Sequence, residues 1–204
     1  MEITVLGASG ATGLELTRQA LERGHTVVAV ARDPCRIALP EAARLIRTAA
    51  DVRDPDAVAA ALHGRRIVLS GLGVAKGDRP GVLTAGARAV AAARPGRIVW
   101  LGAFGTGASA AAAGPLTRTL LRMLPDLADK ETADAIIRDA GGTVFHAGPL
   151  SDGPPGPGRR TVGLGQAPRR LFPARVSRAT VAAAMLDEAE RPGYAGAVAV
   201  PLQR

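Results

Sequence analysis

Three spaced glycines near the start of the chain constrain its fold more than any other feature. Gly7, Gly10 and Gly13 follow the apolar residues 3–6, which predict a buried strand, and precede residues 14–23, which predict a helix. In such a turn the first glycine permits a tight bend, the second lets the backbone approach a pyrophosphate, and the third lets the helix pack closely on the sheet. The spacing therefore predicts a dinucleotide-binding turn rather than a purely structural one.

Backbone N–H groups at the start of that helix are expected to face the diphosphate, with the positive end of the helix dipole behind them. The cofactor-binding residues predicted in the turn are Gly7, Ser9, Gly10, Ala11, Thr12 and Gly13.

The end of the next predicted strand, residues 26–31, indicates which dinucleotide is bound. An NAD site usually has an acidic residue there for the ribose 2′-hydroxyl, whereas an NADP site has an arginine near the 2′-phosphate. Arg32 is the first charged residue after the strand, and Asp33, directly before Pro34, is expected to cap the next turn. NADP(H) is therefore favoured over NAD(H), with an ordinary surface arginine as the alternative interpretation.

Length and composition predict one α/β domain over residues 1–204, because 47% hydrophobic and 22% charged residues are typical of a globular protein. No long uncharged apolar stretch could span a membrane, so a cytoplasmic protein without a membrane partner is expected. Cys35 is the single cysteine, which excludes an intramolecular disulfide. With three scattered histidines beside it, no metal site is predicted.

The net charge of +8 raises the possibility of a nucleic-acid partner, since clustered Lys and Arg bind phosphates. The arginines are scattered along the chain, however, and only 2% of the residues are aromatic, which leaves little for base stacking. The charge is therefore interpreted as a solvated surface, and no nucleic acid is expected to bind.

Strand and helix patterns alternate along the rest of the chain, which predicts a Rossmann-type, doubly wound parallel sheet with helices on both faces. Ligands of such sheets bind beyond the carboxyl ends of the strands. The turns at Gly7, Arg32, Asp51, Gly71 and Gly102 are therefore expected to line one rim. Further strands are expected over 43–47, 67–70, 97–101, 143–146 and 197–201, and further helices over 54–64, 82–94, 116–124, 126–140 and 178–190. The Pro/Gly-rich stretch 148–158 is expected to be irregular and is the candidate for a substrate-side lid.

The glycine turn and the segments 31–34, 51–54, 129–131, 148–154 and 175–178 together resemble a known family. The chain is similar, over nearly its whole length, to the atypical short-chain dehydrogenase/reductases of the NAD(P)H-binding, NmrA-like group, which includes small flavin and biliverdin-IXβ reductases. The resemblance implies that Asp51 and Val52 lie beside the adenine and that Gly71 and Leu72 pass the adenosine ribose. It also implies that Gly102, Ala103 and Gly148 approach the nicotinamide.

The chain departs from that family at the positions that usually supply the acid. Members commonly carry serine after the fifth strand, where this chain has Gly102-Ala103, and many short-chain dehydrogenases have a tyrosine where this chain has Asp126. An Arg-Pro pair usual after the sixth strand is replaced by His146-Ala147. The nucleotide half of the pattern is intact, and the usual acid is missing.

Two residues are the candidates for catalytic roles. Lys130 is expected to hold the nicotinamide ribose or to stabilise a developing oxyanion, and the alternative is a plain i,i+4 ion pair with Asp126. His146 is a candidate general acid, with a structural histidine at a strand end as the alternative.

The expected activity is an NAD(P)H-dependent reduction of a small-molecule substrate, a flat, conjugated acceptor such as a flavin, a quinone or an aromatic polyketide. Such acceptors can take their proton from water, so the missing acid narrows the chemistry without abolishing it. Two alternatives remain, a dinucleotide sensor without turnover and a redox-neutral cyclase or isomerase on the same fold. The sequence leaves the acceptor unspecified and is compatible with a monomer or a homodimer.

Overall fold

The described residues build an eight-stranded sheet in the order β3-β2-β1-β4-β5-β6-β10-β8. The structure is a computed structural model that describes residues 1–75, 77–112, 126–168 and 173–203. Neighbouring strands run parallel except at one edge, where β8 pairs antiparallel with β10, and a separate parallel pair joins β7 to β9. The strands are β1 (Glu2–Leu6), β2 (Thr26–Ala31), β3 (Leu45–Ala49), β4 (Ile67–Ser70), β5 (Arg97–Ala103), β6 (Thr143–Ala147), β7 (Leu150–Ser151), β8 (Arg160–Gly163), β9 (Val176–Ser177) and β10 (Val198–Leu202).

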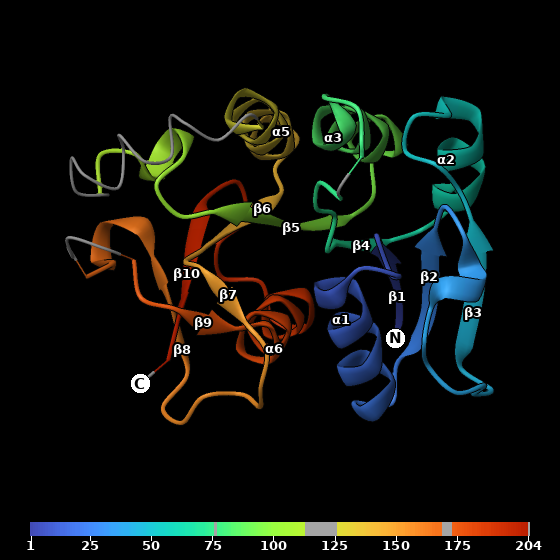
Figure 1. Ribbon diagram of the computed structural model, residues 1–204, viewed down its shortest axis with the longest axis horizontal. Helices are drawn as coiled ribbons and strands as arrows, with labels where there is room; N and C mark the ends of the chain where they lie inside the picture. The colour runs from blue at the N-terminus through green and yellow to red at the C-terminus, as the bar shows by residue number, and fades with distance from the viewer. Residues whose placement is uncertain (76, 113–125, 169–172, 204) are drawn as a thin grey trace.

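Helices cover both faces of the sheet (Figure 1), so the predicted doubly wound α/β fold is confirmed. One buried core packs α1 and α6 on the first face and includes Leu16 and Met185. The other packs α2, α3 and α5 on the second face and includes Leu62 and Ile137. The α-helices are α1 (Ala11–Glu22), α2 (Pro55–Leu62), α3 (Val82–Ala93), α5 (Leu127–Asp139) and α6 (Arg178–Glu190), and the short 3-10 helices are η1 (Pro34–Arg36), η2 (Gly107–Ser109) and η3 (Leu164–Gln166). None of the helices in the described part of the chain is long and apolar enough to cross a membrane.

Local sequence signals start the helices as expected. The Asp54 carboxylate accepts the N–H groups of Asp56 and Ala57 at 3.1 and 3.0 Å, and Ser177 Oγ accepts that of Thr180 at 3.1 Å. The start of α1 is different, because its N-cap is Gly10 and no described side chain hydrogen-bonds to it. Its first N–H groups are therefore left for another partner.

Several expected boundaries were wrong by a few residues. Helix α1 begins at Ala11, directly after its glycine cap, rather than at residue 14, and β3 lies two residues later than expected. Strand β5 continues through Gly102 and Ala103, which were expected to form a turn, because these residues pair with His146 and Ala147 of β6.

The second half of the chain contains further differences. The stretch 148–158 is not wholly irregular, because β7 within it pairs with β9. Strand β8 was not expected, since Arg160–Gly163 has little apolar character and pairs only at the sheet edge. Glu190 of α6 reaches back to the first half of the chain, where its Oε1 lies 2.9 Å from Nε2 of His25, a residue that is only 8% exposed. The helix expected over 116–124 falls outside the described residues.

Candidate functional site

A crevice opens where the winding of the sheet reverses. Strand β1 lies between β2 and β4, and parallel α/β sheets bind ligands beyond the carboxyl ends of the strands at such a point. Two cavities of about 460 and 140 Å³ lie there, and they adjoin because both are lined by Gly10, Gly71 and Leu72. The crevice therefore runs along the rim on which the sequence places the cofactor.

The glycine turn forms part of both cavities and leaves no room for a side chain at Gly7, at Gly13 or at the facing Gly71. Gly7 has a φ of +76°, in the left-handed region, and its carbonyl accepts the Gly10 N–H at 3.0 Å. A Cβ on Gly13 would lie 2.1 Å from Gly7 O, and a Cβ on Gly71 would lie 2.8 Å from Gly13 N. The predicted close packing of helix on turn is thus confirmed, and an anionic diphosphate fits beside the uncapped N–H groups of α1.

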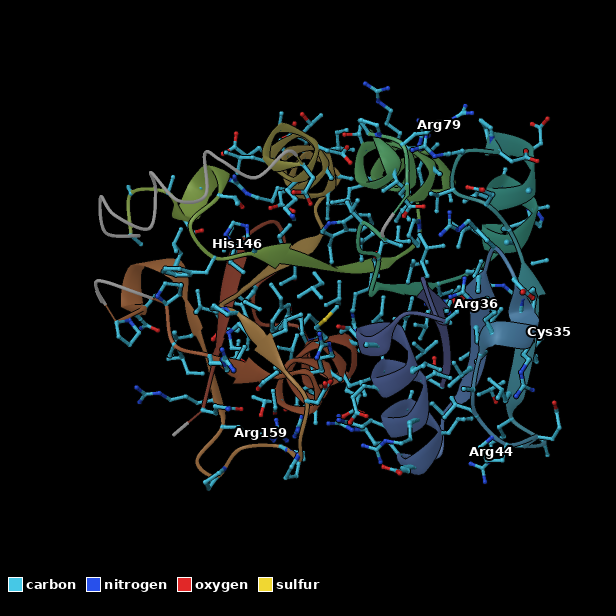
Figure 2. The ribbon with its side chains drawn as sticks, viewed as in Figure 1. Cys35, Arg36, Arg44, Arg79, His146 and Arg159 are labelled. Atoms are coloured by element: carbon cyan, nitrogen blue, oxygen red, sulfur yellow. The ribbon has the colours of Figure 1, made fainter. Side chains whose placement is uncertain are left out.

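The smaller cavity carries two arginines and one carboxylate near the end of β2. Arg32 and Arg36 both line it, and Figure 2 shows Arg36 beside that strand. Arg32 Nη1 donates to Asp78 Oδ1 at 2.7 Å, and the Ala75 N–H donates to Asp78 Oδ2 at 2.8 Å. The Ala75 N–H and, after it, the Arg32 guanidinium keep the pKa of Asp78 below its ordinary value, although burial opposes this.

Of the two residues expected beside the adenine, only one reaches the crevice. Val52 is 6% exposed and lines the smaller cavity. Asp51 lines neither cavity, and its Oδ1 accepts the Arg53 N–H at 2.9 Å in a local turn. An adenine at this place would therefore meet the apolar side chain.

Charged residues gather on the wall of the larger cavity. Asp126, Lys130 and Asp134 come from α5 and the residue before it, and Arg178 comes from the start of α6. Lys130 forms the expected i,i+4 ion pair with Asp126, and its side chain, 24% exposed, still borders the cavity. The ion pair expected from the spacing is therefore present, and the catalytic role of Lys130 stays a prediction.

Arg178 lies on this wall, where the segments 148–154 and 175–178 of the sequence contact each other. Its Nη1 donates to Asp152 Oδ1 at 2.6 Å, and β7 pairs with β9 directly beside this contact. Gly148 of the same segment cannot carry a side chain, since a Cβ would lie 2.1 Å from Ala174 O.

The motif Asp129-Lys130-Glu131 connects three parts of the fold. Asp129 accepts the N–H groups of Thr84 and Leu83 at 2.9 and 3.0 Å and so caps α3 from a neighbouring helix. Burial raises the pKa of Asp129, but the hydrogen bonds from Thr84 and Leu83 outweigh this and leave it below its ordinary value. Glu131 accepts the Gly107 N–H at 2.9 Å and ties η2 to α5. Lys130, between them, is thereby held facing the cavity.

His146 lies behind the cavity wall rather than in it. The residue is fully buried, and Figure 2 shows it inside the molecule near β5 and β6. Its Nε2 lies 3.0 Å from Asp134 Oδ2 and its Nδ1 lies 2.6 Å from Ser109 Oγ. His146 can therefore act on a ligand only through Asp134.

Most predicted site residues meet along the crevice. Those that line at least one cavity are Gly7, Ser9, Gly10, Ala11, Thr12, Arg32, Val52, Gly71, Leu72, Gly102, Ala103, Lys130 and Gly148. Gly13, Asp51 and His146 lie outside the lining.

The charged lining residues that the sequence did not indicate as part of the site include Arg36, Asp78, Asp134 and Arg178. Asp134 had a usable signal, because it lies one helical turn after Lys130 and therefore on the same face.

Comparison with known proteins agrees with this geometry. The model of an NAD(P)H-binding family matches residues 7–192. A search of curated proteins gives no match to the sequence.

Many solved structures share the fold, among them the following three. The first is a short-chain dehydrogenase/reductase from Veillonella parvula in complex with NADP, with a TM-score of 0.80 and 16% identity over 98% of this chain and 93% of that one. The second is the anaerobillin reductase ChuY from Escherichia coli O157:H7, with a TM-score of 0.78 and 20% identity over 100% of this chain and 97% of that one. The third is a candidate NADH-flavin reductase, SP1627, from Streptococcus pneumoniae, with a TM-score of 0.77 and 18% identity over 100% of both chains. Because the family model covers most of the chain and the fold agrees throughout, the protein belongs to the NAD(P)H-binding family of Rossmann-fold proteins, in keeping with the atypical short-chain dehydrogenase/reductase group that its sequence resembles.

Proposed function

We propose that the protein is an NADPH-dependent reductase of a flat, conjugated small molecule. The observation that carries this proposal is that the crevice is continuous. The smaller cavity, lined by Arg32, meets the larger cavity, lined by Lys130, at Gly10 and Gly71. A dinucleotide along this path has its phosphates at the start of α1 and its nicotinamide toward Gly102. At about 460 Å³ the larger cavity is within the usual size range of small-molecule sites.

The preference for NADPH rests on two guanidinium groups. Arginine binds phosphate in a charge-assisted and often bidentate manner, and Arg32 and Arg36 both line the end of the crevice that receives the adenosine ribose. Asp78 opposes this preference, because its carboxylate already holds Arg32 and repels a 2′-phosphate. NADPH binding therefore includes a shift of Arg32 from Asp78 to the phosphate.

The bound cofactor supplies the hydride, and the protein supplies position and charge. Lys130 borders the larger cavity one helical turn before Asp134. Its positive charge stabilises negative charge that develops on the acceptor, or it orients the nicotinamide ribose. Arg178 adds a second positive charge to the same wall.

The acceptor class follows from the lining of the cavity and from the neighbours. Leu101 and Leu150 contribute apolar surface, while Lys130 and Arg178 offer charge to polar substituents at the rim. A ring system with anionic or carbonyl groups matches such a wall. The relatives named as an anaerobillin reductase and a candidate NADH-flavin reductase act, by those names, on conjugated molecules.

The test begins with protein purified without ligand. Calorimetry with NADPH and NADH measures binding, and a panel of flavins, quinones and aromatic polyketides measures NADPH oxidation. Oxidation with one of these acceptors supports the proposal. Binding without oxidation would favour a dinucleotide sensor, and conversion of an acceptor without cofactor would favour a redox-neutral enzyme.

A further inference from the structure

The carboxylate of Asp134 lies against Gly102, near the carboxyl end of β5. A Cβ on Gly102 would lie 2.8 and 2.9 Å from its two oxygens, so the carboxylate fills the space that any side chain at position 102 would need. Asp134 lines the larger cavity, and its side chain is only 7% exposed. The chain therefore has a buried carboxylate, rather than a hydroxyl, at this end of the crevice.

A second buried side chain, that of His146, lies directly behind this carboxylate. Among the described residues, only His146 hydrogen-bonds to Asp134, through Nε2 and Oδ2 at 3.0 Å. Behind the imidazole, Ser109 Oγ lies 2.6 Å from Nδ1 and 3.1 Å from the carbonyl oxygen of Thr106, and it accepts the N–H of Gly105 at 2.7 Å. The result is a chain of hydrogen bonds from the cavity wall into the interior.

The arrangement has the members of a nucleophilic Ser-His-Asp triad in the opposite orientation. In such a triad the serine faces the substrate and the aspartate is buried behind the histidine. Here Ser109 and His146 are fully buried, and the aspartate borders the cavity. The geometry therefore excludes Ser109 as a nucleophile and leaves Asp134 as the group that can meet a ligand.

The serine hydroxyl allows the imidazole to change its protonation. A hydroxyl has one hydrogen and can turn it toward either acceptor, the Thr106 carbonyl or Nδ1 of His146. When it turns to the carbonyl, Nδ1 can carry a hydrogen and donate it to Ser109, and when it turns to Nδ1, the hydrogen of the imidazole is on Nε2. The pair of Asp134 and His146 can therefore hold one additional proton or release it without a movement of heavy atoms.

We propose that Asp134 is the general acid of the reductase and that His146, backed by Ser109, is the residue that positions and stores its proton. This proposal rests on the proposed function. In one turnover the acceptor gains a hydride from the reduced cofactor and a proton from Asp134, forming one bond to hydrogen from each. The hydride donor is thereby oxidised and the acceptor reduced, and one proton from bulk solvent restores the pair.

Several charged groups border the cavity beside the pair. Asp126 precedes α5, Lys130 lies in its first turn, and Arg178 begins α6. Strand β5 contributes only Gly102 at the point of contact, and the segment at η2 contributes the neutral Ser109. Lys130 is paired with Asp126 and Arg178 with Asp152, so each cation on this wall already has a carboxylate partner of its own.

The experiment compares two acceptors that differ in their need for a proton. A quinone needs a hydride and a proton to become a hydroquinone, whereas the N-methylacridinium cation becomes neutral on taking a hydride alone. Asp134→Asn should slow quinone reduction by about a hundredfold or more, which is the usual contribution of a general acid, and change acridinium reduction by less than about twofold. Asp139→Asn, an exposed carboxylate on the same helix, is the matched control and should change neither rate.

Two further measurements separate a proton relay from a merely structural pair. The pH profile of quinone reduction should lose one limb in Asp134→Asn, while that of acridinium reduction stays the same. Nitrogen NMR of the ligand-free native protein should show the ring nitrogens of His146 changing protonation as the pH is varied. In Asp134→Asn and in Ser109→Ala the same change should occur at a different pH.

Two results would overturn the proposed relay of a proton through His146 and Asp134. One is an equal slowing of quinone and acridinium reduction by Asp134→Asn, and the other is a set of His146 NMR signals that do not respond to pH. If native protein reduces neither acceptor, the proposed function fails first, so the two failures are distinguishable. Should Asp134→Asn not fold, Ser109→Ala carries the same comparison, because its hydroxyl lies outside the cavity lining.

Discussion

Arg32 and Asp78 lie 46 residues apart in the sequence, yet their side chains are joined at 2.7 Å where the smaller cavity opens. The Arg32 side chain is 50% exposed, so the pair contributes little to stability. Its consequence is functional, because the guanidinium that the sequence assigns to the cofactor is already held by a carboxylate.

Arg32→Ala should weaken NADPH binding by about ten- to a hundredfold, the effect of losing one hydrogen bond to a charged group, and leave NADH binding nearly unchanged. Calorimetry with both cofactors measures the difference. Arg44→Ala is the control, because Arg44 is exposed and lines neither cavity. Equal losses for NADPH and NADH would remove the argument for NADPH.

Asp78→Asn should strengthen NADPH binding, because it frees Arg32 and removes a negative charge near the 2′-phosphate. The gain should be several-fold at low ionic strength and smaller at high salt, since salt screens exposed charges. NADH, which lacks that phosphate, should bind about as before. Asp56→Asn, an exposed carboxylate on α2, is the matched control, and an unchanged NADPH affinity in Asp78→Asn would contradict the prediction.

Lys130→Met should lower turnover by about a hundred- to a thousandfold, which is the usual effect of removing a positioned electrostatic group. Its ion pair with Asp126 is an i,i+4 contact, and losing it should cost only about 0.5 kcal/mol of unfolding free energy. Steady-state rates and chemical unfolding measure the two effects. Arg138→Met is the control on the same helix, and turnover within about twofold of the native rate would make Lys130 a surface residue, since that is under roughly 0.5 kcal/mol of barrier.

Asp129→Ala should cost about 1 kcal/mol of unfolding free energy, because it removes the cap of α3. The pKa of Asp129 is lowered in the folded protein, so its stabilisation is present above the pKa of the unfolded carboxyl, about 3.9, and is lost as the pH falls through the folded value. Native and variant proteins should therefore differ in stability at neutral pH and converge in acid. Urea unfolding across that range measures this, and a difference that persists in acid would contradict it.

Gly71→Ala should destabilise the protein by about 1–3 kcal/mol, the usual range for overpacking, and should also weaken cofactor binding. The new methyl group would lie 2.8 Å from Gly13 N, and backbone rather than a side chain would have to move. Gly165→Ala is the control for stability, because a Cβ there has no described atom within 4 Å. Thermal unfolding and calorimetry report the two effects, and equal stability of the two variants would contradict the close approach of turn and helix.

The sequence by itself determined the framework of the fold. The spacing of Gly7, Gly10 and Gly13 and the caps at Asp54 and Ser177 are local signals, since each acts on residues within one turn of the chain. They were enough to predict the alternation of strands and helices and the rim on which the site lies. The same signals placed helix ends only to within a few residues, because fraying and pairing partners decide the last positions.

The tertiary structure alone decided which charged groups meet. Asp78 reaches Arg32, Asp129 caps α3 and Asp134 reaches His146 across spans of chain that have no periodicity to reveal them. Strand β8 likewise exists because the edge of β10 offers it hydrogen bonds, and its own residues do not predict a strand. Local sequence therefore specified the elements that bind a dinucleotide. Only their packing could bring together Asp134, His146 and Ser109, the three residues that we propose hold and transfer the proton.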